Sequence, residues 1–207
     1  SPTCPTFTNA GANTVYFMAY DPAGNYSNAY GSAQVIITKV QLTATADNQS
    51  MTYGDTTLPT ESVTYTGFVN GETDSVVSGT SGITYTYSNS TGDVTVDGTL
   101  GAGTYTITPN VSGLLATNYT FAPATGTLTV DKKVVTVTAD PQAMTYGAAT
   151  LPTESVTYSG FANGDTKSVV TGTVGYGYFD GATSVTRSST LPAAMTPASA
   201  RPWRATA

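Results

Sequence analysis

Residues 51–80 read MTYGDTTLPTESVTYTGFVNGETDSVVSGT, and residues 144–173 repeat this stretch as MTYGAATLPTESVTYSGFANGDTKSVVTGT. The two copies are identical at 23 of 30 positions, and each aligned pair lies 93 residues apart. A fixed offset of this kind is typical of tandem structural units. We therefore interpret the rest of the chain as complete, partial or interrupted copies of one unit.

The composition favours a folded chain that is mainly β. Of the 207 residues, 39% are apolar and 10% are charged, and both fractions are below those of average globular domains. Disordered segments usually combine high charge with few aromatic or β-branched residues. Here the polar residues are chiefly threonine, with 42 Thr beside 14 Tyr, and this composition suits half-buried strands.

Charge and missing residue types exclude several function classes. The net charge of −6 argues against a nucleic-acid partner and against an anionic membrane surface. Histidine is absent, which removes the commonest general base and transition-metal ligand. Cys4 is the single cysteine, so neither an intrachain disulfide nor a thiolate metal cage can form. The sequence predicts a protein that is not an enzyme, with no catalytic residues, no cofactor and no metal.

The sequence contains neither an apolar run of 18 residues nor a signal peptide at Ser1. We expect no membrane insertion within these residues. We also expect them to be an internal part of a longer protein, whose export signal lies elsewhere.

Residues 1–39 are predicted to end a preceding domain. Alternation in TVYFMAYD predicts a strand, DPAGN predicts a turn, and AQVIITK predicts a second strand. The segment GNYSNAYGSAQVIITK, residues 24–39, resembles the closing hairpin of bacterial Ig-like surface repeats. This resemblance implies the C-terminal strands of an Ig-like repeat.

The complete unit is predicted at residues 40–132. Apolar residues alternate there with Thr or Ser, which is the period of strands with one buried and one exposed face. The alternating groups are Leu42 with Ala44 and Ala46, Val63 with Tyr65, Ile83 with Tyr85 and Tyr87, Tyr105 with Ile107, and Leu128 with Val130.

One segment of this unit, FVNGETDSVVSG, breaks the alternation and predicts a short helix. Asn70 or Thr73 would cap its start. Val76 and Val77 are expected to face inward, and Gly79 is expected to end the helix.

The second unit is predicted to be incomplete and to occupy residues 133–194. Its match to the first unit fades after about Tyr178, so its last two or three strands should be missing and its packing poor. Residues 195–207 form an aberrant tail, with two of the three arginines and the only tryptophan. A frameshift or truncation near Ala194 explains this tail, and a divergent C-terminus is the alternative; we expect the tail to be disordered.

The junctions between the predicted units contain no flexible linker. Lys39 and Lys132, again 93 residues apart, mark equivalent positions just before a new unit starts. Because such short connections limit hinge motion, we expect the units to stack end to end as a fairly stiff rod. Either lysine is also a candidate for an intramolecular Lys–Asn isopeptide bond, although a boundary lysine is more often simply exposed.

Three sequence motifs carry a resemblance to a known family. TYG at residues 52–54, GFVNGET at residues 67–73 and NYTFAPATGTLTV at residues 118–130 together resemble the MBG domain of the YGX type, a repeat of large bacterial surface and secreted proteins. The resemblance implies small β modules in tandem, β-grasp-like with one short helix each, with an Ig-like β-sandwich as the alternative. It implies no catalytic residues.

The residues of these motifs are interpreted as structural. Gly54 and Gly71 are expected to adopt positive φ in turns, and the Asn-Gly pairs at Asn70 and Asn163 are typical of turns. Tyr53 and Phe68 are expected to pack at the rim of the unit. A ligand-facing role is the less favoured alternative.

Acidic residues offer two weaker candidate sites. The loops DPAGN, NGETD and TGDVTVDG contain oxygen ligands that suit calcium, but their spacing matches no known calcium motif, so we interpret them as solvated turns. Glu61, its copy Glu154, and Glu72 are the only glutamates. Glycoside hydrolysis needs two carboxylates that face one cleft, and polar turn residues are the simpler interpretation.

Together these features predict a structural or adhesive repeat of a bacterial extracellular, secreted or surface-anchored protein, acting as a stalk or spacer. Its expected partners are neighbouring modules of the same chain, with host or environmental glycans or proteins as further candidates. The alternative is a carbohydrate- or mucin-binding module, in which exposed tyrosines such as Tyr85 or Tyr87 stack on sugar rings.

Overall fold

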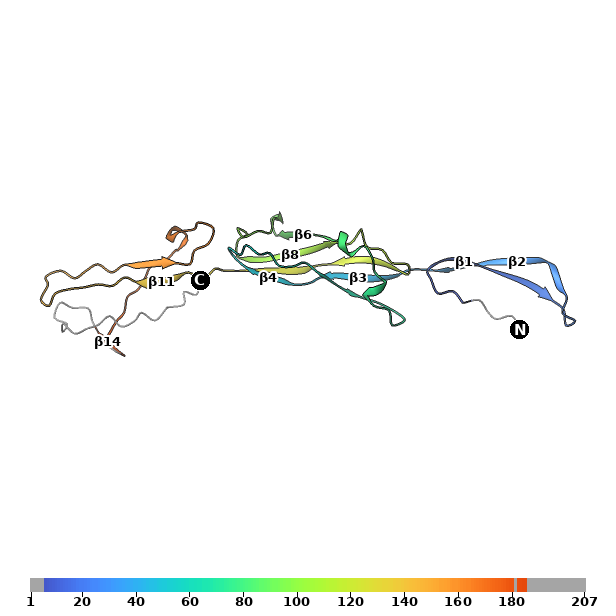
Figure 1. Cartoon of the computed structure of the whole chain (residues 1–207), viewed down its shortest axis with the longest axis horizontal. Coiled ribbons are helices and arrows are strands. Elements are labelled where there is room, and N and C mark those ends of the chain that lie inside the picture. Colours follow the sequence, from blue (N-terminus) through green and yellow to red (C-terminus); the bar gives the residue numbers. More distant parts are fainter. Residues whose placement is uncertain (1–5, 181, 186–207) are drawn as a thin grey trace.

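A computed structural model describes residues 6–180 and 182–185. Figure 1 shows three groups of strands that follow one another along the long axis of the chain. The predicted mainly β fold is confirmed, and helical structure in the described residues is limited to short 3-10 turns. No helix in this part of the chain is long and apolar enough to cross a membrane.

The first group is a hairpin of β1 (Gly11–Tyr20) and β2 (Tyr26–Ile37), as the alternation predicted. Asp21 fixes its turn, because the carboxylate accepts hydrogen bonds from the backbone N–H groups of Ala23 and Asn25 and from the Asn25 amide. Tyr16 packs edge-on against Tyr30, with the ring centroids 5.5 Å apart.

The second group is the first repeat unit, which forms two mixed sheets. One sheet has the order β4-β10-β8-β6-β7, and the other has the order β5-β3-β9. The strands are β3 (Val40–Ala46), β4 (Gln49–Thr52), β5 (Val63–Thr66), β6 (Thr84–Asn89), β7 (Gly92–Val94), β8 (Gly103–Asn110), β9 (Tyr119–Ala124) and β10 (Gly126–Asp131). The unit is mainly β as predicted, with two small mixed sheets and no α-helix among its described residues.

Two strand pairs run in parallel from one end of this unit to the other. β3 pairs with β9 from Val40 and Tyr119 onward, and β4 pairs with β10 up to Thr52 and Asp131. The paired residues stay 79 positions apart in both sheets. The first segment of the unit, β3 and β4, therefore runs parallel to the last segment, β9 and β10. Both segments cross from the smaller sheet into the larger one at the same point.

The core of the first unit lies between its two sheets. Leu42 and Leu128 are fully buried, and Ala46 of the smaller sheet packs with the buried residues of the larger sheet. Among the intervening threonines, Thr104 and Thr129 are exposed as the alternation predicted, whereas Thr43, Thr45 and Thr127 are half-buried. The buried apolar residues are Leu42, Ala44, Ala46, Met51, Tyr87, Tyr105, Ile107, Pro109, Leu114, Tyr119, Leu128 and Val130.

The predicted short helix is present only as 3-10 turns, η1 at Asp74–Val76 and η2 at Thr80–Gly82. Thr73 occupies the N-cap position, but its side chain makes no capping hydrogen bond. The prediction that Val76 faces inward is wrong, since its side chain is exposed. A single turn has no continuous inner face, and Ser78 instead anchors the segment by two backbone hydrogen bonds to Leu115.

The third group belongs to the second repeat unit. It comprises β11 (Thr136–Ala139) paired with β12 (Val156–Ser159), η3 (Lys167–Val169), and β13 (Tyr178–Asp180) paired with β14 (Thr183–Val185). None of the side chains described in this unit is buried. The predicted poor packing is therefore observed over the described residues. The predicted tail at residues 195–207 and the break near Ala194 lie outside the described residues.

Candidate functional site

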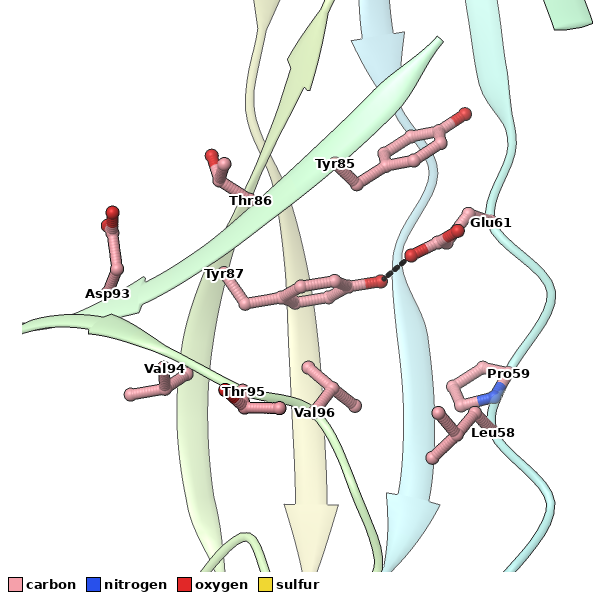
Figure 2. A pocket seen from close by; sticks show the side chains of 10 residues that line it. All are labelled: Leu58, Pro59, Glu61, Tyr85, Thr86, Tyr87, Asp93, Val94, Thr95 and Val96. Carbon is pink, nitrogen blue, oxygen red and sulfur yellow. Dashed lines mark hydrogen bonds between the residues drawn. The ribbon is translucent and has the colours of Figure 1, made fainter. Parts of the chain in front are cut away.

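The hollow beside β6 and β7 is the candidate ligand site of the first unit. Its volume is about 310 Å³, and Figure 2 shows the loop before β5 on one side and the two strands on the other. Tyr85 and Tyr87 project from β6 toward this loop. The lining residues are Leu58, Pro59, Glu61, Tyr85, Thr86, Tyr87, Asp93, Val94, Thr95 and Val96.

Tyr87 does not have the exposure that stacking on a sugar requires. Its side chain is only 8% exposed, and its hydroxyl donates a hydrogen bond of 3.0 Å to Glu61 Oε1. Burial and this hydrogen bond raise the pKa of the Tyr87 phenol. The alternation of Ile83, Tyr85 and Tyr87 predicted a buried face, and Tyr87 belongs to the core as that pattern indicated; the exposure that the sugar-binding alternative required of Tyr87 is not observed. Tyr85, two residues earlier on the same face, is half-buried and keeps one edge in the hollow.

The tyrosine–glutamate hydrogen bond recurs in the second unit. Tyr178 donates to Glu154 Oε1 at 2.7 Å, and Glu154 is the copy of Glu61. Tyr178 also pairs with Val185 as Tyr87 pairs with Val94, so the two tyrosines are equivalent. The bond is present in the second unit although no described side chain there is buried. In each unit it therefore fixes the loop before β5 or β12 against the strand that carries the tyrosine. Glu61 and Glu154 are thus structural acceptors in this arrangement.

A second recurring polar cluster was not predicted from the sequence. Asp47 accepts hydrogen bonds from the hydroxyls of Ser62 (2.6 Å) and Thr64 (2.7 Å), and these bonds lower the pKa of its carboxyl. Asp140 makes the same bonds to Ser155 and Thr157, with the same direction of pKa shift. The offset of 93 residues, shared by all three members of the cluster, is the signal that identifies it in the sequence.

The acidic loops that were considered for calcium and interpreted as turns include several carboxylates that accept hydrogen bonds within the chain. Asp97 accepts from the backbone N–H and the hydroxyl of Thr99, which lowers its pKa, and Asp21 closes the β1–β2 turn. Glu72 accepts from the hydroxyl of Tyr119 and thereby raises the tyrosine pKa. Within residues 6–180 and 182–185, no three acidic or sulfur side chains are grouped to hold a metal.

Two of the family-like motifs meet where the first unit joins the second. Tyr53 donates a hydrogen bond of 3.0 Å to Asp165 Oδ2, and the Asn163 side chain donates one of 2.7 Å to the carbonyl oxygen of Gly98. Gly54 lies against Ala162 so closely that a methyl group at Gly54 would clash with the Ala162 side chain. The turn at residues 52–55 of one unit therefore receives the Asn-Gly loop of the next.

The backbone of these motifs follows the sequence prediction. Gly54 and Gly71 have φ of 90° and 73°, and Asn70 and Asn163 have φ of 55° and 54°. Phe68 packs edge-on against Tyr119, with the ring centroids 5.7 Å apart, at the N-terminal end of the unit.

The junction before the first unit uses different residues. Asn118 accepts a hydrogen bond of 2.8 Å from the backbone N–H of Ala10, and Lys39 Nζ donates one of 2.9 Å to the Ala116 carbonyl. A hollow of about 580 Å³ lies at this end, bounded by Lys39 and the loop that precedes β9. Lys132, the equivalent of Lys39, is exposed.

The MBG domain (YGX type) family matches this chain over residues 42–129 and 135–193. No curated protein and no solved structure matches it significantly.

Proposed function

Because the chain belongs to the MBG domain (YGX type) family, we propose that it is a non-enzymatic repeat segment of a bacterial extracellular or cell-surface protein, where it acts as a stalk or spacer. Its immediate partners are the neighbouring units of the same protein. The hairpin of β1 and β2 is then the end of a preceding Ig-like repeat. In this role, length and stiffness matter more than a chemical site.

The junction between the two repeat units carries this proposal. Only residues 132–135 connect β10 to β11, and the Tyr53–Asp165 and Asn163–Gly98 hydrogen bonds cross the junction. Short connections with interface contacts restrict hinge motion between neighbouring repeats. A chain of such units keeps its direction and holds a distant domain away from the cell surface.

Differences between the two copies support a role for this junction. Where the first unit has Val69 and Glu72, the second has the smaller Ala162 and Asp165, and both contact the first unit. Asp55 accepts a hydrogen bond of 2.8 Å from the Thr52 backbone N–H and so braces the receiving turn. The second unit has Ala148 at that position.

Pulsed electron spin resonance tests the stiffness of the junction. Spin labels at Thr104→Cys and Thr138→Cys, in a Cys4→Ser background, place one label on an exposed position of each unit. We expect a narrow distance distribution, which Gly54→Ala broadens because the added methyl group clashes with Ala162. Ala162→Gly in the same chain should make the distribution narrow again.

Gly147→Ala is the matched control for this variant. Gly147 occupies the same motif position with a similar positive φ of 79°, but open space surrounds it. Both substitutions therefore carry the same backbone strain, and only Gly54→Ala adds the clash at the junction. A broad distribution in the unmodified chain, or equal broadening by both variants, would contradict a stiff spacer.

The half-buried edge of Tyr85 supports a second candidate, a carbohydrate-binding module. Tyrosine rings stack on sugars, and Glu61 and Asp93 of the same hollow offer acceptors for sugar hydroxyls. A glycan array probed with the whole chain would then show binding that Tyr85→Ala removes and Tyr26→Ala, in the distant β1–β2 hairpin, leaves intact. Binding that survives Tyr85→Ala, or no binding at all, rules out this hollow as the site.

A further inference from the structure

The first unit has the strand arrangement that resists being pulled apart by its ends. Tension along the chain enters at Val40, where β3 begins, and leaves at Asp131, where β10 ends. These two points lie at opposite ends of one continuous parallel pairing, because Val40 pairs with Tyr119 and Thr52 pairs with Asp131. Pulling therefore slides the two paired segments along each other.

Sliding loads many hydrogen bonds at once. The backbone hydrogen bonds of a parallel pair are evenly spaced and run between the two strands, so a force along the strands loads all of them together. The parallel pairing covers residues 40–45 with 119–124 and residues 49–52 with 128–131. We propose that this pairing is a mechanical clamp, which makes the first unit a load-bearing element under tension.

The point where the two segments pass from one sheet to the other is closed by specific residues. Asn48 Oδ1 accepts a hydrogen bond of 2.9 Å from the Thr127 backbone N–H and so bridges the interval between the two ladders. Gly126 is buried there, and any side chain at that position would clash with the Ala46 carbonyl. The clamp is thus continuous across the sheet boundary.

The second unit has the opposite arrangement over its described residues. β11 and β12 are antiparallel, and Thr136 pairs with Ser159, so the chain enters and leaves this pair at the same end. Tension opens such a pair one hydrogen bond at a time. Pro141 stands where the first unit has Asn48, so the bridging side chain is absent as well.

Load bearing is useful in a protein that spans a distance, so this role of the clamp rests on the proposed stalk function. The stiff spacer and the mechanical clamp can be contradicted independently of each other. A flexible junction with a strong first unit would remove the stiff spacer and keep the clamp, whereas a stiff junction with a weak first unit would do the reverse.

Single-molecule force spectroscopy on the full chain, held by its two termini, tests the clamp. The first unit should unfold in one step that releases about 300 Å of chain, given its residues 40–131. Its unfolding force should be several-fold higher than that of the second unit. Release of the first unit at the same low force as the second overturns the proposal.

Changing the direction of pulling gives the decisive control, because the folded unit stays the same. Ser112 is exposed in the loop before β9 and borders the same hollow as Lys39, at the end where the chain enters. Force applied between the N-terminus and Ser112→Cys, in a Cys4→Ser background, separates β3 from β9 at that end. We expect unfolding at a several-fold lower force, and equal forces in the two geometries contradict a clamp.

Asn48→Ala tests the bridge between the two ladders. It should lower the end-to-end unfolding force and leave the Ser112 geometry unchanged. Asn110→Ala is the matched control, since it also removes an asparagine side chain that accepts from a backbone N–H, here that of Ser112, outside the clamp. A fall in both geometries, or an equal effect of Asn110→Ala, shows that Asn48 serves general stability only.

Discussion

The first and second repeat units have almost the same sequence over thirty residues but differ in how they are packed. In the first unit, twelve apolar residues are buried, Pro109 among them. In the second, the described side chains of residues 133–180 and 182–185 are half-buried or exposed throughout. Shared motifs therefore give the two units similar turns and two equivalent strand pairs, β3–β5 with β11–β12 and β6–β7 with β13–β14, without giving them the same core.

The difference follows from where the core residues lie in the repeat. The shared stretch at residues 51–80 contributes Met51 alone to the core, whereas β8, β9 and β10 contribute Tyr105, Ile107, Tyr119, Leu128 and Val130. The described residues of the second unit include no counterpart of these three strands. The features that the second unit shares with the first are local ones, namely the hydrogen bonds to Asp140, the Tyr178–Glu154 bond and the turns.

Leu42→Ala and Val135→Ala, at equivalent positions of the two units, should have the largest difference in effect. Leu42 is fully buried and Val135 is half-buried. Deleting a buried leucine side chain costs about 2–5 kcal/mol of unfolding free energy, and we expect less than about 1 kcal/mol for Val135. Chemical denaturation followed by tyrosine near-ultraviolet circular dichroism measures both, and equal costs would mean that the second unit has a comparable core.

Tyr87→Phe and Tyr178→Phe should show a smaller contrast. Each removes one hydrogen bond to a glutamate, Glu61 or Glu154. In the packed first unit, the loss should be about 1 kcal/mol of unfolding free energy. In the second unit, we expect no change in the main unfolding transition, because that transition reports the first unit. A lower unfolding free energy of the main transition in Tyr178→Phe would instead show that the stabilities of the two units are coupled.

The Asp47 cluster should produce the smallest effect, which is visible as pH dependence. Hydrogen bonds from Ser62 and Thr64 lower the carboxyl pKa in the folded state, so the folded state binds its proton less readily than the unfolded state. The resulting stability is present above the unfolded pKa, near pH 4, and is lost as the pH falls through the folded pKa. Solvent screening keeps this contribution small.

Asp47→Asn should therefore flatten the fall of the first unit's melting temperature between about pH 5 and pH 2. Asp140→Asn, the equivalent change in the second unit, should leave that profile unchanged. An unchanged profile in Asp47→Asn would show that other carboxyl groups cause the acid sensitivity.

The sequence predicted those parts of the fold that depend on local pattern. The alternation of Leu42, Ala44 and Ala46 predicted a strand and its buried face, and the Asn-Gly pairs predicted turns with positive φ. β4 and β9 were not predicted as strands, because they are defined by parallel pairing with distant segments, which one sequence does not reveal. The parallel pairing of residues 79 positions apart was not predicted for the same reason, because it joins segments that are distant in the sequence.

The candidate sites were harder to predict than the strands. Alternation placed Tyr85 and Tyr87 on one face but did not show that the loop around Glu61 covers Tyr87. The contacts of Tyr53 and Asp165 were missed because repeated motifs were interpreted within one unit, whereas these residues meet between two units. The exchange of Val69 and Glu72 for Ala162 and Asp165 was the available signal.

Amide hydrogen exchange along the whole chain tests the contrast between the two units most directly. Protection reports the free energy of opening each strand, and it rises with burial in a packed core. We predict slow exchange with a common opening free energy in β3, β8 and β10, and fast exchange in β11 and β12. Equal protection of β11 and β3 would contradict the account, because it would show that the second unit folds as completely as the first.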